Sequence, residues 1–173
     1  FILDKFHNKG FEIFLDLKLH DIPNTVYKAL KNIYSHGVWM SNIHLLGGKE
    51  MINAAQKAKL ESNKEAFLIG VTILTSLDET QLKLIGFKDK VPQLVKKLAS
   101  EAKKSLLDGV VCSAQEAKEL KKTFGKDFVL VTPGIRTNAQ KGDQSRVTTL
   151  KEAINYGSDY LVLGREISKA DDI

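Results

Sequence analysis

The segment FLDLKLHDIPNT (residues 14–25) places two acids and a base in and just after an apolar, strand-like run. Side chains alternate between the two faces of a strand, so Asp16 and Lys18 share one face. The opposite face carries four aliphatic side chains suited to packing beneath helices: Ile13, Leu15, Leu17 and Leu19. Burying a charge is costly unless it is paired, so a stabilising ion pair is one explanation. A catalytic site is favoured, because Lys18 lies at the carboxyl end of the strand and Asp21 follows in the next loop.

Polar groups also follow three later apolar runs, and together with the first segment they predict a ring of groups around one mouth. These groups are Thr75 and Ser76, Gly134 and Arg136, and Gly164 and Arg165. A glycine and an arginine at a helix start offer backbone N–H groups and a guanidinium, which suit a phosphate dianion. The long polar stretch 136–149 contains Gln144 and Arg146, where a closing loop could reach the same phosphate.

The elements that must position these residues alternate between short apolar runs and longer amphipathic ones. Strands are predicted at 11–18, 39–46, 67–74, 109–113, 128–134 and 159–164. Helices are predicted near 24–36, 49–61, 91–106, 114–123 and 148–156, with N-caps at Asn24, Ser113 and Thr148. This order indicates an α/β protein with parallel strands and helical crossovers.

Two α/β architectures fit such an order. An open doubly wound sheet is possible, but no glycine-rich dinucleotide motif follows the first strand. A (β/α)₈ TIM barrel needs eight strands, so we expect two strands before Phe1 and part of the last helix after Ile173. The chain is then a single, partial barrel domain over residues 1–173.

Composition limits the classes of function. The net charge of +5 comes from lysines spread along helix-like stretches, which indicates solvated faces and no nucleic-acid site, and suits an anionic small molecule. The single cysteine, Cys112, excludes an internal disulfide and is expected in the core. No apolar stretch is long enough for a membrane helix and no signal peptide is evident, so we expect a cytoplasmic protein.

Several of these segments resemble the bacterial orotidine 5'-phosphate decarboxylases. The similar segments are FLDLKLHDIPNT, GVVCSAQE (109–116), VTPGIR (131–136), GDQ (142–144) and YLVLGR (160–165), in consistent order along the chain. The resemblance implies a dimeric (β/α)₈ enzyme that converts orotidine 5'-phosphate to UMP and CO₂ in pyrimidine synthesis, without a cofactor or a metal.

The resemblance also assigns roles to individual residues. It makes Lys18 the proton donor and Asp16 and Asp21 its charged partners, with Asp21 reaching the neighbouring subunit of a homodimer. The implied substrate-binding residues are Ile22, Asn24, Thr25, Thr75, Ser76, Arg136, Gln144, Gly164 and Arg165. An aspartate and a lysine that the family carries on its first two strands have no counterpart in this sequence. Glu166 replaces a common proline and is expected to point to solvent.

These roles explain a charged strand. Loss of CO₂ leaves a carbanion, and a fixed ammonium can stabilise it and then deliver a proton. The neighbouring carboxylates favour the charged form of Lys18. Two alternatives are a magnesium-dependent sugar-phosphate decarboxylase or aldolase of the same superfamily, and a catalytically inactive phosphate-binding barrel. His20 and His44 lack metal-ligand spacing and are expected to be structural, and Trp39 and Met40 are expected in the core.

Overall fold

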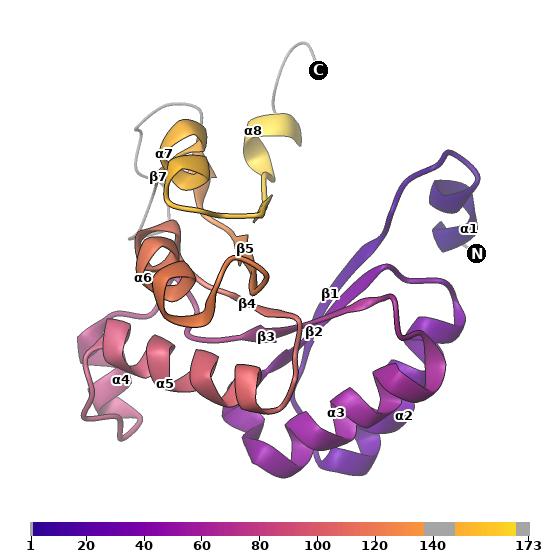
Figure 1. The fold of residues 1–173 in the computed structure, drawn as a ribbon, viewed down its shortest axis with the longest axis horizontal. Helices are drawn as coiled ribbons and strands as arrows, with labels where there is room; N and C mark the ends of the chain where they lie inside the picture. Colours follow the sequence, from indigo (N-terminus) through magenta and orange to yellow (C-terminus); the bar gives the residue numbers. More distant parts are fainter. Residues whose placement is uncertain (1, 137–147, 169–173) are drawn as a thin grey trace. The chain divides into compact units, whose positions relative to one another are not determined.

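The structure, a computed structural model, describes residues 2–136 and 148–168. Strands and helices alternate along the chain (Figure 1). The strands are β1 (Phe14–Leu19), β2 (Met40–His44), β3 (Phe67–Val71), β4 (Gly109–Val111), β5 (Val129–Thr132), β6 (Ile135–Arg136), β7 (Thr148–Thr149) and β8 (Tyr160–Leu161). The helices are α1 (Ile2–His7), α2 (Pro23–Ser35), the 3-10 turn η1 (Leu45–Gly47), α3 (Gly48–Ser62), α4 (Glu79–Leu84), α5 (Val91–Lys104), α6 (Ala114–Phe124), α7 (Leu150–Asn155) and α8 (Arg165–Ser168).

The chain folds into two compact units, and each is described by itself. The first unit comprises residues 1–71 and 101–109, and the second comprises residues 72–100 and 110–173. Strands β1, β2 and β3 are parallel neighbours in the first unit. Strands β4, β5 and β8 are neighbours in the second, and β4 begins at the last residue of the first.

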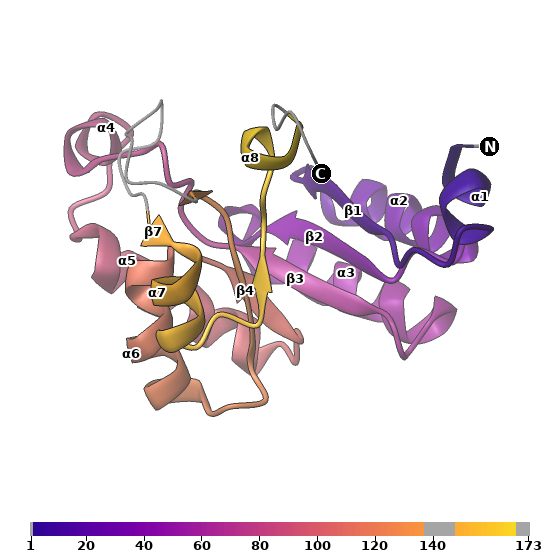
Figure 2. The same cartoon turned by 90° about the horizontal axis from the view of Figure 1, so that it is seen from above.

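In the first unit, helices α2 and α3 pack together against one face of β1–β3 (Figures 1 and 2). Their apolar positions recur at helical spacing, and Val26, Leu30 and Ile33 of α2 are buried. Strand β2 is buried along its first four residues, including the polar pair Ser41 and Asn42. A polar side chain in so apolar a position needs hydrogen-bond partners, which makes this strand important for the site.

In the second unit, a small core joins α6, α7 and the ends of β6 and β8. Ala114, Ile135 and Ala153 are buried there, and Leu150, Leu161 and Leu163 pack against them. The two-residue strands β6 and β7 pair in parallel, Ile135 with Thr148 and Arg136 with Thr149. This ladder holds together the two described ends of the long polar stretch predicted at 136–149.

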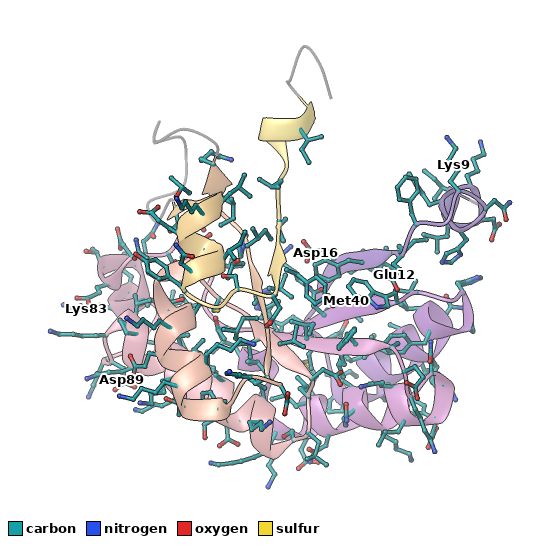
Figure 3. The ribbon with its side chains drawn as sticks, turned by 45° about the horizontal axis from the view of Figure 1, so that its top comes forward. Lys9, Glu12, Asp16, Met40, Lys83 and Asp89 are labelled. Carbon is teal, nitrogen blue, oxygen red and sulfur yellow. The ribbon has the colours of Figure 1, made fainter. Side chains whose placement is uncertain are left out.

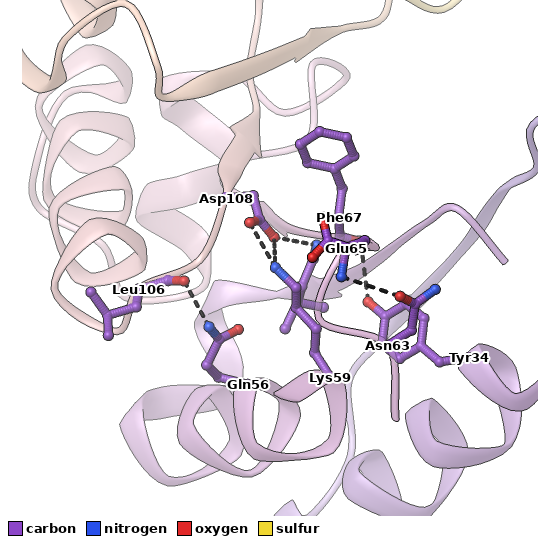
Figure 4. A network of polar contacts seen from close by, with 9 residues as sticks. Tyr34, Gln56, Lys59, Asn63, Glu65, Phe67, Leu106 and Asp108 are labelled. Carbon is purple, nitrogen blue, oxygen red and sulfur yellow. Dashed lines mark hydrogen bonds and ion pairs between the residues drawn. The ribbon is translucent and has the colours of Figure 1, made fainter. Parts of the chain in front are cut away.

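A lysine and an aspartate bridge the amino-terminal ends of strands in each unit. In the first, Lys59 from the last turn of α3 donates to both carboxylate oxygens of Asp108 at 2.7 Å (Figure 4). Asp108 also accepts the Leu68 N–H. In the second, Lys121 of α6 donates to Asp159 at 2.7 Å, and Asp159 accepts the Leu130 N–H. We call these pairs the two lysine bridges.

All six predicted strands are present, and the five predicted helices correspond to α2, α3, α5, α6 and α7. Ser113 is an N-cap as predicted, and its hydroxyl and the Glu116 side chain form a capping box. The other two predicted N-caps are wrong. Ile22 takes the place predicted for Asn24, because Pro23 occupies the first turn of α2, and Thr149 caps α7 in place of Thr148.

Near β1, the burial of side chains agrees less well with the prediction from the sequence. Cys112 and Met40 are core residues as expected, whereas Trp39 is half-buried and packs edge-on against Phe67. Leu17 was expected beneath the helices but is 55% exposed. The register of β1 on β2 shifts between Leu15 and Leu19, so the strict alternation of the two faces is lost there. In the described part of the chain, no helix is both long enough and apolar enough to cross a membrane.

Candidate active site

Asp16 and Lys18 form an ion pair on β1. The Lys18 Nζ lies 2.7 Å from Asp16 Oδ2, and both side chains are a little over one-third exposed. Figure 3 labels Asp16 on this strand. Lys18 is the residue before the last of β1, so the pair lies toward the carboxyl end of a parallel strand. Enzymes built on parallel α/β barrels place their reactive groups at that end.

The backbone of Lys18 is left-handed, with φ at +50°. A residue with a Cβ adopts this conformation at a cost of about 1–2 kcal/mol, and within a strand it interrupts the regular ladder. The register shift between Leu15 and Leu19 surrounds this residue. The irregularity therefore falls on the residue that the family resemblance implies to be the proton donor.

Asn42 of β2 holds both members of the pair. Its Oδ1 accepts the backbone N–H of Lys18 at 2.7 Å, and its Nδ2 donates to Asp16 Oδ1 at 2.5 Å. Asn42 is fully buried. The Asn42 side chain thus connects the backbone of Lys18 to the carboxylate of Asp16.

The loop after β1 presents the second acid. Asp21 is exposed, and its Oδ1 accepts the N–H of Ile22 at 2.6 Å. Ile22 is 66% exposed, and Asn24 and Thr25 are exposed in the first turn of α2. An open pocket of about 490 Å³ adjoins this loop, and its lining comprises His20, Asp21, Ile22, Pro23, Leu46 and Gly47.

His20 and His44 lie together beside the ion pair, with ring centroids 5.4 Å apart. Burial lowers the pKa of His44, and the positive charges of His20 and Lys18 lower it further, against a smaller opposing effect of Asp16. His44 is therefore favoured in its neutral form near neutral pH. Among residues 2–136 and 148–168, no three His, Cys, Asp or Glu side chains are grouped so that they could hold a metal ion.

The remaining predicted substrate-binding residues belong to the second unit. Thr75 is half-buried and Ser76 exposed in the segment that follows β3 in the chain. Arg136 is half-buried and lies on β6, where pairing with β7 fixes its backbone. Gly164 immediately precedes α8, whose first residue is Arg165, and Gln144 lies outside the described residues.

The structure thus brings together Asp16 and Lys18, and it adds Asn42, which the sequence reasoning missed. A signal for Asn42 was present, because Ser41 and Asn42 interrupt an otherwise apolar run in WMSNIHLL (39–46). Two adjacent polar residues inside a buried strand indicate side chains with specific hydrogen-bond partners. Their partners could not be deduced from spacing, because they lie on a different strand.

A paired acid and base near the carboxyl end of a parallel strand, within repeated β/α units, is the arrangement of an α/β-barrel enzyme. Comparison with known proteins agrees with this class and identifies a family within it. The family described as "Orotidine 5'-phosphate decarboxylase / HUMPS family" matches residues 2–173. The chain belongs to this family.

Individual relatives are similar over almost the whole chain. An orotidine 5'-phosphate decarboxylase of Marinomonas sp. is 54% identical over 174 residues, which cover 99% of this chain and 74% of the relative. One from Coxiella burnetii is 51% identical, covering 98% of this chain and 73% of the relative. The chain spans about three quarters of the length of these relatives.

A solved structure confirms the fold class. The crystal structure of orotidine 5'-phosphate decarboxylase from Lactobacillus acidophilus matches with a TM-score of 0.87 and 38% identity. The match covers 99% of this chain and 74% of that structure. The predicted α/β barrel class and the family resemblance are both confirmed.

Proposed function

We propose that this chain catalyses the decarboxylation of orotidine 5'-phosphate to UMP and CO₂, a step of pyrimidine biosynthesis. The observation that carries the proposal is the Asp16–Lys18 ion pair near the end of β1 in a member of this family. Relatives that are 48–54% identical bear the name of that enzyme, so the magnesium-dependent alternative is not favoured. A catalytically inactive barrel is not favoured either, because the acid and base of the predicted site are both present and in contact.

The chemistry assigns a separate task to each charged group. The bond between C6 of the pyrimidine and its carboxylate breaks, CO₂ leaves, and the electron pair stays on C6. The Lys18 ammonium stabilises that developing charge and transfers a proton to C6, and the lysine then regains a proton from solvent. Asp16 holds the ammonium in position through an ion pair in which the Lys18 Nζ lies 2.7 Å from Asp16 Oδ2.

The other predicted residues bind the substrate away from the reacting carbon. We assign Ile22, Asn24, Thr25, Thr75 and Ser76 to the nucleoside, and Arg136, Gln144, Gly164 and Arg165 to the phosphate. Binding energy gained at the phosphate can orient the pyrimidine and so raise turnover as well as affinity. This assignment carries family positions over to this chain residue by residue.

We further propose that the enzyme is a cytoplasmic homodimer that needs no cofactor. Asp21 completes the site of the neighbouring subunit in this proposal. Its exposure, and its place in a loop beyond the end of β1, support such a reach.

The test is the loss of orotidine 5'-phosphate absorbance after addition of the purified protein. We expect turnover that persists in EDTA and disappears in the Lys18→Ala variant. The Lys64→Ala variant is the matched control, because Lys64 is an exposed lysine just before the amino-terminal end of β3, away from the carboxyl ends of the strands. Absence of turnover in the wild-type protein, or loss of the wild-type turnover on addition of EDTA, would contradict the proposal.

A further inference from the structure

We infer that Asn42 is a positioning residue that holds the Lys18–Asp16 pair in its reactive arrangement. The inference rests on the function proposed above, and it adds a residue from a different strand to the predicted site. Asn42 touches neither end of the substrate in this account. It acts through the backbone of one partner and the carboxylate of the other.

The chemistry of its neighbours fixes which way the Asn42 amide points. Its carbonyl oxygen faces a donor, the Lys18 N–H, at 2.7 Å, and its amino group faces an acceptor, Asp16 Oδ1, at 2.5 Å. The reversed amide would place oxygen against carboxylate and N–H against N–H, losing both bonds. The side chain therefore has a single orientation in which it binds both partners.

Each of these bonds controls one degree of freedom of the reactive pair. The bond to the Lys18 N–H supports a left-handed backbone at φ +50°, which a lysine does not adopt without compensation. The bond to Asp16 Oδ1 orients the carboxylate so that Oδ2 faces the Lys18 ammonium at 2.7 Å. Lys18 and Asp16 are both partly exposed, so their own ion pair is a weak constraint, whereas Asn42 is fully buried.

The position of Asn42 in the sheet makes it a rigid support. It lies in the middle of β2, and its backbone is in register with Ile69 of β3. A fully buried side chain bonded at both ends loses its rotational freedom on folding and not during each turnover. The ammonium is thereby placed before the substrate arrives.

The decisive experiment compares kcat and KM for orotidine 5'-phosphate among the wild-type protein and two variants. We expect Asn42→Ala to lower kcat about 100-fold, a usual cost of a misplaced reactive group, with KM changed less than about threefold. Ser41→Ala is the matched control, because Ser41 is equally buried on the same strand but contacts the Leu15 carbonyl. A loss of kcat in Asn42→Ala smaller than about threefold, or an equal loss in Ser41→Ala, would overturn the inference.

The Asn42→Asp variant separates positioning from support of the fold. It has the same shape and keeps an acceptor for the Lys18 N–H, but it places a second carboxyl group against Asp16. The titratable groups near this position are Asp16 and Lys18 on β1 and His44 on β2, with His20 against His44. Two carboxyls in contact retain one proton up to a higher pH than a lone carboxyl. The protonated carboxyl group at position 42 can donate a hydrogen bond to Asp16, as the Asn42 amide does. The ratio of the kcat of Asn42→Asp to that of the wild type should therefore rise as the pH is lowered. A ratio that does not change with pH would contradict the inference.

A crystal structure of Asn42→Ala gives an answer that does not depend on turnover. We expect the Lys18 φ to become negative, or the Lys18 Nζ to move out of contact with Asp16. An unchanged pair would overturn the inference even if the enzyme is a decarboxylase. If the wild-type protein proves inactive, the proposed function fails, but this crystal structure still decides the role of Asn42. If Asn42→Ala does not fold, a crystal structure and the pH series of Asn42→Asp decide that role.

Discussion

At the scale of single residues, the pKa of His44 depends on the charge of Lys18. Burial is the main cause of its lowered pKa, and the Lys18 ammonium contributes. Replacing Lys18 by alanine should therefore raise the pKa of His44, measured by NMR titration of the ring protons. Lys64→Ala should leave it unchanged, and a pKa of His44 that fell in the Lys18→Ala variant would contradict the proximity of the two groups.

The same shift predicts how His44 affects stability. Its pKa in the folded protein lies below the ordinary value of 6.5, so the unfolded chain binds the proton more readily. The contribution of neutral His44 to the free energy of unfolding is fully present above about pH 6.5. It is lost as the pH falls through the lower pKa that His44 has in the folded protein. Urea unfolding of wild type and His44→Gln at several pH values should show a stability difference that changes only in this acidic window.

Leu106 offers a separate test of backbone strain. It has φ at +59°, it is 73% exposed, and its carbonyl accepts the Gln56 amide at 2.8 Å. Glycine adopts this conformation freely, and the side chain buries little, so Leu106→Gly should stabilise the fold by about 1 kcal/mol. Leu60→Gly, inside α3, should instead destabilise it by a similar amount, about 1 kcal/mol. Chemical denaturation measures both, and a destabilised Leu106→Gly would contradict the prediction.

At the scale of elements, the two lysine bridges anchor helices to the amino-terminal ends of strands. The side chains of Lys59 and Asp108 are 6% and 24% exposed, and those of Lys121 and Asp159 are 15% and 36% exposed. Removal of one partner from a buried pair leaves an uncompensated charge and costs about 3–5 kcal/mol. We expect a loss of that size for Lys59→Met and a smaller loss for Lys121→Met.

The measurement for the bridges is the free energy of unfolding in urea. Lys57→Met is the control, because Lys57 is on the same helix as Lys59 but is 67% exposed. Its loss should be near zero, as for most surface ion pairs. Equal losses for Lys57→Met and Lys59→Met would show that burial does not set the contribution of these pairs.

Elements were predictable from the sequence where local patterns determine them. The apolar runs of β2, β3 and β5 and the helical periodicity of α2 and α5 were sufficient to place those elements. Helix α4 was missed, because its single buried residue, Leu82, gives a six-residue helix no periodic signal. The N-cap errors at α2 and α7 are small shifts, which reflect a proline and a choice between adjacent threonines.

The site was predictable only in part, for a physical reason. Asp16 and Lys18 are two residues apart on the same strand, so their proximity was predictable from the sequence alone. The role of Asn42 depends on the register of β2 against β1, and that register contains an irregularity at Lys18. No pattern within β1 indicates a left-handed lysine, because its compensation comes from another part of the chain.

At the scale of the whole molecule, the proposed homodimer gives a complementation test. If Asp21 acts in the neighbouring site, a dimer of one Lys18→Ala and one Asp21→Ala subunit contains one intact site and one doubly altered site. Random reassociation of equal amounts should restore roughly one quarter of wild-type activity, since half of the dimers are mixed. Each variant alone should be inactive.

The control for this experiment uses Lys18→Ala mixed with Asp16→Ala. Both residues lie on β1 and form a pair within one subunit, so their mixed dimers should contain no intact site. Recovery in that mixture would contradict the assignment of Asp16 to its own subunit. No recovery from the Lys18→Ala and Asp21→Ala mixture would place Asp21 in its own site.

The left-handed backbone at Lys18 has a consequence for how mutations of this protein would be selected. Glycine at position 18 would relieve about 1–2 kcal/mol of strain, while the partly exposed ion pair that it removes contributes little. A screen for thermal tolerance alone would therefore favour loss of the lysine on which turnover is proposed to depend. With the role proposed for Lys18, stability and activity compete at this residue, and selection for the reaction would maintain the lysine.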